Sequence, residues 1–137
     1  MIDFIGFPNE FSHSKDNVTA VVSQIASDHD FSIKSLIFNG LTDSQLLEIN
    51  ITHLDHDTFT DIITFDYTRK NRLSGEIFIS LERVKENAKV AKVPFDIELR
   101  RIIYHGVLHL VGYKDKLSKD KLLMTSKEDY YLSLQAQ

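Results

Sequence analysis

Short β-branched and aromatic runs are concentrated in the first 81 residues of the chain, and they show the apolar patterns that are typical of strands. Four such runs predict strands at residues 1–7, 31–39, 60–68 and 73–81. The last two runs are separated only by the basic segment 69–72. We therefore expect them to pair as an antiparallel hairpin.

Apolar residues spaced three and four apart indicate amphipathic helices. One helix is expected at 15–30, and a second follows Thr42, whose side chain favours the N-cap position, and ends before a polar loop at 53–59. Three more helices are expected in the last part of the chain, at 81–93, 96–111 and 118–134. Pro94 breaks the pattern between the first two of these. Strands therefore come early and helices late.

This order of elements favours an α+β fold over a regularly alternating α/β fold. We expect a small mixed β-sheet of about four strands with about five helices packed on it. The chain has 137 residues and shows no internal repeat, low-complexity tract or Gly/Ser/Pro linker. A single domain spanning residues 1–137 is the prediction.

Composition limits the chemistry that this domain can carry. Cysteine is absent, so a transition-metal site would have to be built from His, Asp and Glu. The first residues lack a basic segment followed by a long apolar one, and no apolar stretch approaches the roughly 18 residues of a membrane span, so we expect a cytoplasmic protein. The formal net charge of −4 argues against nonspecific coating of nucleic acid but leaves a local basic surface open.

The helix expected at 96–111 carries an unusual set of polar residues beside its apolar stripe. His105 and His109 are four residues apart, which places both imidazoles on one face, close enough for both to reach one ion at about 2.0–2.1 Å. Gly112 suits a left-handed helix terminator, after which the chain doubles back. Asp115 lies where that return would supply a third ligand. The buried stripe is expected to comprise Leu99, Ile102, Ile103, Gly106, Val107 and Leu110.

A lone histidine on a helix is more often a core or half-exposed residue than a ligand. Here that interpretation has to account for a pair of histidines, a helix-ending glycine and a carboxylate together. The residues by themselves leave the two interpretations about evenly balanced.

The segment His105 to Asp115, "HGVLHLVGYKD", resembles the signature of the YbeY family of rRNA maturation factors, which runs His-Gly-x-Leu-His-Leu-x-Gly-Tyr-Asp-His and binds zinc. The upstream segments "TDIITFDY" and "SGEIFIS" are similar to the family's Thr-Asp/Asn-Val-Leu-Ser-Phe and Gly-Asp-Ile-x-Ile-Ser segments, in the expected order. The resemblance spans about Thr60 to Asp115. It implies one Zn²⁺ per chain, bound by His105, His109 and Asp115, although another divalent metal remains open.

Two departures from the family pattern affect these expectations. The family's third histidine is Asp115 here, and the acidic residue before it is Lys114. An anionic ligand lowers the net charge of the ion, so its water should be less acidic and the site should work best at higher pH, or with another metal. In addition, an arginine that the family usually carries before the first strand of the hairpin aligns with Leu54.

The resemblance implies a single-strand-specific endoribonuclease that processes rRNA, notably the 3′ end of 16S rRNA, and takes part in ribosome quality control. The expected partners are rRNA and the small ribosomal subunit, with no membrane, and a monomer is favoured. A zinc protease is unlike this pattern, because its HExxH motif places a glutamate where this chain has Gly106.

No general base is evident in the motif itself. Either water activated by the ion attacks without one, or a carboxylate from the sheet assists, for which Asp61, Asp66 and Glu76 are the candidates and Asp61 and Glu76 are the two we name as catalytic. Attack by the 2′-hydroxyl of the RNA also remains open.

RNA also needs cationic contacts to its phosphates. The candidates are Arg69 and Arg72 in the hairpin loop, Arg101 one turn before His105, and Lys114 and Lys116 on either side of Asp115. The two lysines are favoured because they adjoin the presumed ligand.

Two other functions remain open beside the endoribonuclease. A noncatalytic ribosome-assembly factor with a structural ion would bind ribosomal particles with a dead site, and a metallohydrolase of another phosphoester would show no preference for RNA. In each case an ion bound only by the folded chain should raise the melting temperature.

Overall fold

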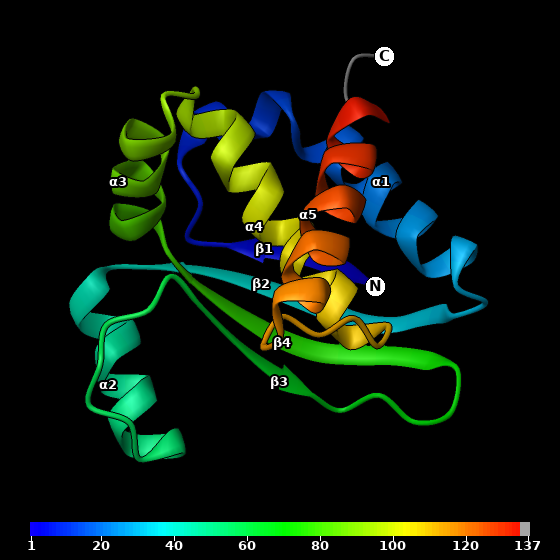
Figure 1. Cartoon of the computed structure of the whole chain (residues 1–137), viewed down its shortest axis with the longest axis horizontal. Helices are drawn as coiled ribbons and strands as arrows, with labels where there is room; N and C mark the ends of the chain where they lie inside the picture. Colours follow the sequence, from blue (N-terminus) through cyan, green and yellow to red (C-terminus); the bar gives the residue numbers. More distant parts are fainter. Residues whose placement is uncertain (135–137) are drawn as a thin grey trace.

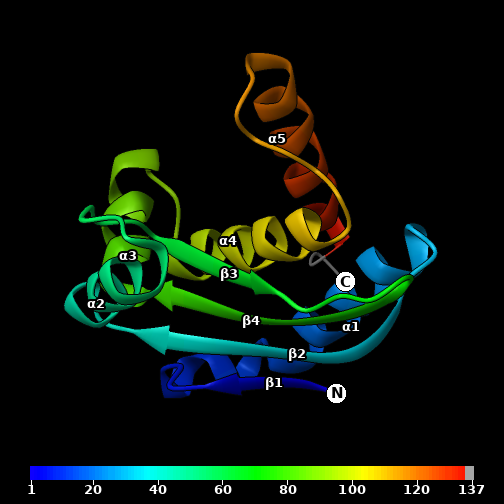
Figure 2. The same cartoon turned by 90° about the horizontal axis from the view of Figure 1, so that it is seen from below.

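The computed structural model describes residues 1–134 and contains one four-stranded sheet with the strand order β1-β2-β4-β3. The strands are β1 (Ile2–Ile5), β2 (Ser32–Leu41), β3 (Ile62–Asp66) and β4 (Arg72–Ser80). Strand β2 runs parallel to both β1 and β4, while β3 is antiparallel to β4 (Figures 1 and 2). The mixed sheet and the antiparallel hairpin predicted from the sequence are confirmed.

Five α-helices accompany the sheet: α1 (Lys15–Asp28), α2 (Asp43–Leu54), α3 (Leu81–Ala91), α4 (Phe95–Leu110) and α5 (Ser118–Ser133). Helices α1, α3, α4 and α5 lie on one side of the sheet and α2 lies on the other (Figure 1). The loop after α4 rises away from the sheet, and α5 runs back from the far end of this loop toward α4 (Figure 2). The α+β class expected from the sequence is confirmed.

Helix α4 lies at the centre of the packing and positions the residues of interest. A Cβ atom on Gly106 would lie 3.1 Å from Ile62 Cδ1 and 3.4 Å from Ile77 Cδ1, so the missing side chain lets α4 lie close against β3 and β4. All six residues of the predicted stripe are buried. Tyr104 and Leu108 are buried as well, because α4 contacts α1, α3 and α5 in addition to the sheet.

The boundary at the end of α2 differs from the prediction. Thr42 caps the helix as expected, accepting a hydrogen bond from the Gln45 backbone N–H while the Gln45 side chain accepts from the Thr42 N–H. The helix continues through His53 and Leu54, two residues that the sequence predicts to lie in the loop. Asp55 ends it in the left-handed conformation, with φ of 56°, so a backbone change rather than polarity terminates the helix.

A short 3₁₀-helix, η1 (Asn9–His13), precedes α1 and was not predicted. Its one buried side chain, Phe11, packs against Phe4 and Phe7. None of the helices within residues 1–134 is long and apolar enough to cross a membrane.

Candidate metal centre

The last turn of α4 and the turn after it are set by Gly112. Its φ of +114° is a backbone conformation that L side chains rarely adopt. The Gly112 N–H donates to the His109 carbonyl at 3.1 Å, and the Tyr113 N–H donates to the Leu108 carbonyl at 3.0 Å. This pair of hydrogen bonds is the Schellman motif. The chain therefore reverses at Gly112 and carries Asp115 back to the helix end.

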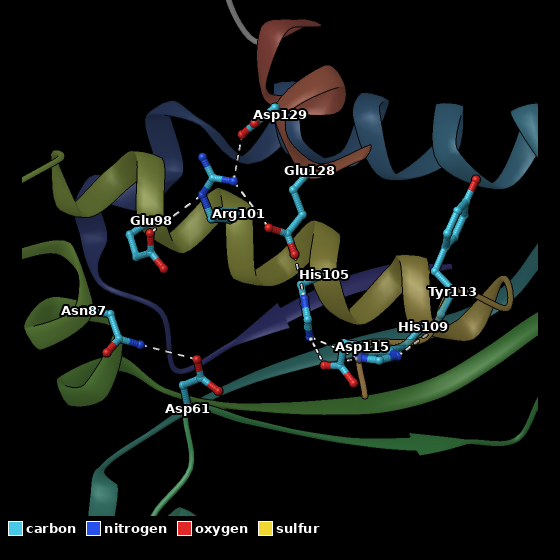
Figure 3. Close-up of polar contacts among 10 residues, drawn as sticks. All are labelled: Asp61, Asn87, Glu98, Arg101, His105, His109, Tyr113, Asp115, Glu128 and Asp129. Atoms are coloured by element: carbon cyan, nitrogen blue, oxygen red, sulfur yellow. Dashed lines mark hydrogen bonds and ion pairs between the residues drawn. The ribbon is translucent and has the colours of Figure 1, made fainter. Parts of the chain in front are cut away.

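The reversal brings three side chains together at one point (Figure 3). The Nε2 atoms of His105 and His109 are 3.1 Å apart, and Asp115 Oδ2 is 3.3 Å from the first and 3.2 Å from the second. Among residues 1–134 this is the only group of three or more His, Asp or Glu side chains whose ligand atoms all lie within 4.8 Å of one another. The structure thus brings together the three residues that the sequence nominated as ligands.

The remaining nitrogen of each imidazole already has a partner. His105 Nδ1 is 2.6 Å from Glu128 Oε2, and His109 Nδ1 is 2.9 Å from the Tyr113 carbonyl oxygen. Both partners only accept hydrogen bonds, so each Nδ1 is the donor, and the Nε2 atom of a neutral ring then carries a lone pair. Two lone pairs and a carboxylate oxygen consequently face one another.

A cation bound between the two Nε2 lone pairs and the Asp115 oxygen would offset the repulsion among these three electron-rich atoms. Two ligands bound at about 2.1 Å in tetrahedral geometry stand about 3.4 Å apart, close to the separations of 3.1, 3.2 and 3.3 Å seen here. Two imidazole nitrogens and one carboxylate oxygen are ligand types that Zn²⁺ accepts. The donor set and its spacing therefore fit a zinc ion.

On balance, the surroundings of His105 favour the protonated form of its imidazole. Burial lowers the pKa of this imidazole, but the hydrogen bond to Glu128 and the charges of Glu128, Asp115 and Asp61 together raise it above its ordinary value. Protons and metal ions compete for the same Nε2 lone pair, so metal affinity should fall as the pH falls.

Glu128 is a residue of this centre that the sequence analysis missed. It comes from α5, is only 6% exposed, and accepts a hydrogen bond from Arg101 Nη1 at 3.3 Å in addition to the one from His105. A signal was present: Glu128 occupies the buried face of α5 between Met124 and Tyr131, at the spacing i, i+4, i+7. A charged residue in an otherwise apolar stripe marks a specific partner.

A cavity of about 390 Å³ opens between α4, α5 and the start of β3, and His105 and Asp115 lie in its wall. Acidic residues dominate its lining, which includes Asp61, Glu98 and Glu128, against the cations Arg101 and Lys121. The centre is therefore reached through a predominantly acidic cleft.

Asp61, one of the two predicted catalytic carboxylates, lines this cleft, and its Oδ2 atom accepts a hydrogen bond from Asn87 at 3.3 Å. Burial raises the pKa of the Asp61 carboxyl above its ordinary value, against the lowering effect of a backbone hydrogen bond and of the charges of His105 and Arg83.

The structure does not bring Glu76 to the cluster. Side chains alternate between the faces of β4, and Ile77 contacts Gly106 of α4. The neighbouring Glu76 therefore points to the opposite face of the sheet, where it accepts a hydrogen bond from the Tyr67 hydroxyl at 3.2 Å. The sequence contained this information, because Leu73, Gly75, Ile77 and Ile79 form the buried face of the strand.

The predicted cationic residues fall into three places. Lys114 and Lys116 line a cavity of about 330 Å³ together with His109 and Asp115. Arg101 is engaged by carboxylates instead of standing free. Its partners are Asp129 at 2.9 Å, Glu128 at 3.3 Å and Glu98 at 3.8 Å.

Arg69 and Arg72 lie at the turn of the β3–β4 hairpin, where their backbones pair with each other at 3.1 and 3.3 Å. Leu54, the residue that the resemblance aligns with a family arginine, is the last residue of α2 and is 43% exposed. Lys121, which the sequence analysis did not nominate, does line the cleft.

Comparisons with known proteins agree with one another. The profile of the family described as Endoribonuclease YbeY matches residues 8–135. Endoribonuclease YbeY of Flavobacterium johnsoniae is 43% identical over 133 residues, covering 95% of this chain and 96% of that protein. The same-named protein of Flavobacterium psychrophilum is 58% identical over 92 residues, covering 67% of this chain and 66% of that protein.

A solution structure of a Thermotoga maritima protein superimposes with a TM-score of 0.71 at 25% identity, covering 98% of this chain and 89% of the other. The family profile and this fold match therefore each cover nearly the whole chain.

Proposed function

Because this chain belongs to the family of YbeY endoribonucleases, we propose that it is a zinc-dependent, single-strand-specific endoribonuclease acting on rRNA. The proposed ligands of the ion are His105, His109 and Asp115. The convergence of their Nε2 and Oδ2 atoms at 3.1 to 3.3 Å is the observation that supports the proposal most directly.

His105, His109 and Asp115 would hold the zinc ion, and the bound ion would lower the pKa of water and polarise a phosphoryl oxygen. Side chains of this chain would supply the general base and the contacts to phosphate. Asp61 lies in the same cleft and is the proposed general base, taking the proton of the attacking hydroxyl or water. Its raised pKa suits this task, because a base works best when its pKa approaches the working pH.

Lys114 and Lys116 are the proposed phosphate contacts nearest the centre, since they share a cavity with His109 and Asp115. Arg69 and Arg72 at the hairpin turn would bind the strand farther along. Arg101 is the weakest of the candidates, because three carboxylates already neutralise its guanidinium.

We further propose that the substrate is the precursor at the 3′ end of 16S rRNA, bound on the small ribosomal subunit, and that the chain serves ribosome quality control. It would do so as a cytoplasmic, monomeric, single-domain protein. The family to which the chain belongs supports this assignment.

The test is cleavage of a single-stranded RNA that matches the 3′ end of 16S rRNA by the zinc-loaded protein. His109→Ala should lose cleavage by several orders of magnitude while keeping its fold, as judged by circular dichroism. His56→Ala is the matched control, because His56 is an exposed histidine outside the cleft, and it should cleave like wild type. Equal cleavage by His109→Ala and wild type would refute the proposal.

The Asp115 carboxylate in place of the family's third imidazole favours one second candidate, a noncatalytic ribosome-assembly factor with a structural ion. This alternative predicts that wild type fails to cut RNA with any divalent metal at any pH. It also predicts that His109→Ala binds small subunits as tightly as wild type.

A further inference from the structure

We infer that Glu128 is a positioning residue that fixes the imidazole of His105 so that its Nε2 atom faces the ion, and that Arg101 holds Glu128 in place for this task. The inference rests on the proposed metal centre. It assigns a role in metal binding to α5, a helix that contributes no ligand.

Contact geometry is the first support. Glu128 Oε2 lies 2.6 Å from His105 Nδ1, a short separation that is typical of a charge-assisted hydrogen bond. The second oxygen, Oε1, accepts from Arg101 Nη1 at 3.3 Å. One carboxylate thus joins the metal-facing ring to a guanidinium, and Figure 3 shows it descending from α5 onto His105.

Burial is the second support. Glu128 is 6% exposed and lies on the buried face of α5 between Met124 and Tyr131, where an apolar side chain would pack without loss of solvation. A buried carboxylate costs free energy unless charged partners compensate. The two close partners of Glu128 are Arg101 and His105, one of the proposed metal ligands. We therefore assign to the buried carboxylate the task of orienting the His105 imidazole.

The consequence for the ligand is chemical. While Nδ1 donates to Glu128, the ring cannot turn over, and Nε2 is the only nitrogen left to bind an ion. The second ligand does not depend on such a side chain, because His109 Nδ1 donates to a backbone carbonyl, that of Tyr113. Substitution at Glu128 should therefore disturb His105 selectively.

The experiment measures Zn²⁺ affinity by competition with a chromogenic chelator for wild type, Glu128→Gln and Asp129→Asn. Asp129→Asn is the matched control, because Asp129 binds the same Arg101 nitrogen at 2.9 Å without touching His105. Loss of an outer partner of a metal-bound histidine typically weakens metal affinity by about 10–100-fold. We expect a loss in that range for Glu128→Gln and less than about threefold for Asp129→Asn.

A second readout follows the ring itself. Nitrogen-15 NMR of the zinc-loaded wild type should show His105 protonated at Nδ1 with Nε2 bound to the metal, and the protected Nδ1–H signal should be lost or exchange faster in Glu128→Gln. A merely structural role for Glu128 would leave both the affinity and this signal unchanged. Such a result, in a variant that melts like wild type without metal, would overturn the inference.

If Glu128→Gln does not fold, Glu128→Asp replaces it, because it keeps the charge beside Arg101 while withdrawing the carboxylate by one methylene. An affinity equal to that of wild type would then overturn the inference, and a loss would support it. Failure of the proposed metal centre is distinguishable, because wild type itself would then bind no stoichiometric Zn²⁺. Failure of the endoribonuclease activity alone would leave Zn²⁺ binding, and its dependence on Glu128, intact.

Discussion

The two histidines of the centre are held in different ways. His109 is fixed by the carbonyl of Tyr113, only four residues farther along the chain, in a turn that one glycine determines. His105 is fixed by Glu128, which is 23 residues away on another helix. One side of the site is therefore built by local backbone geometry and the other by the packing of α5 on α4. Each side should fail under a different perturbation.

Removal of the ion tests both sides at once and should have the largest effect. If zinc is present at about 1,000 times its dissociation constant, its binding stabilises the folded chain by about 4 kcal/mol. Chelation should therefore lower the melting temperature by roughly 10 °C or more, measured by calorimetry with and without EDTA. His109→Ala provides the control, since EDTA should scarcely alter its melting curve. An unchanged curve for demonstrably depleted wild type would contradict a site formed by the folded chain.

Gly112→Ala should disrupt the turn that positions His109 and Asp115, which is the locally built side of the site. The Gly112 φ of +114° is strained for alanine even though the added methyl group would meet no atom within 4 Å. The expected cost is about 1–3 kcal/mol in the free energy of unfolding. Zinc affinity should fall with it, because the turn carries both the Tyr113 carbonyl and Asp115. Urea unfolding measures the loss of stability, and zinc titration measures the loss of affinity. Lys114→Ala is the control for stability, because Lys114 lies in the same turn without a positive φ, and it should unfold at nearly the same urea concentration as wild type.

Asp61→Asn should change the stability of the folded chain and the proposed RNA cleavage in opposite directions. Burial raises the pKa of Asp61 in the folded chain, so the folded state holds its proton to higher pH than the unfolded state, and stability declines as the pH rises between the two pKa values. At neutral pH the ionised carboxylate is a cost that asparagine removes.

The metal-free variant should therefore melt above wild type at pH 7. The gap should close below the ordinary pKa of an aspartate, about 3.9. Asp57→Asn, in the exposed loop after α2, should show no such gap. A variant that is less stable at pH 7 would contradict this account, and RNA cleavage by the zinc-loaded form should fall if Asp61 is the base.

Tyr131→Phe should give the smallest effect, and it bears on the long-range side. The Tyr131 hydroxyl donates to Asp28 Oδ2 at 2.7 Å and so ties α5, which carries Glu128, to the end of α1. This hydrogen bond, with one from Gln24, lowers the pKa of Asp28. Stability from a lowered carboxyl pKa is present above the ordinary value and is lost as the pH falls through the lowered one.

Wild type should accordingly be slightly more stable than Tyr131→Phe at neutral pH, and the difference should shrink below the ordinary pKa of Asp28 and vanish only below its lowered pKa in the folded chain. Paired thermal melts across pH measure it. Tyr130→Phe is the control, because Tyr130 is 52% exposed on the same helix. A difference that persists unchanged at low pH would show that Asp28 is not its source.

Much of the fold and the local half of the site were predictable. Helical spacing places His105 and His109 together in any helix, and Gly112 followed by a return of the chain needs only short-range geometry. The strand assignments succeeded for the same reason, since alternation is a local property.

Other residues escaped prediction or were misplaced. Glu128 was missed because nothing near it in sequence identifies its partner, although its place in an apolar stripe was a signal. Glu76 was offered as a catalytic residue, but the alternation along β4 turns it to the face opposite α4. Arg101 is a predicted RNA contact, and in the structure its guanidinium forms ion pairs with three carboxylates.

The element order, the α+β class and the three proposed ligands, which lie within eleven residues of one another, could be predicted from the sequence, because they depend on backbone periodicity and on one glycine. The tertiary structure alone decided which carboxylates reach the centre. Glu128 forms its hydrogen bond with His105, and Asp61 lines the same cleft, only once β3 and α5 have packed against α4. Contacts between segments far apart in sequence arise from the burial of apolar faces, which no local pattern specifies residue by residue.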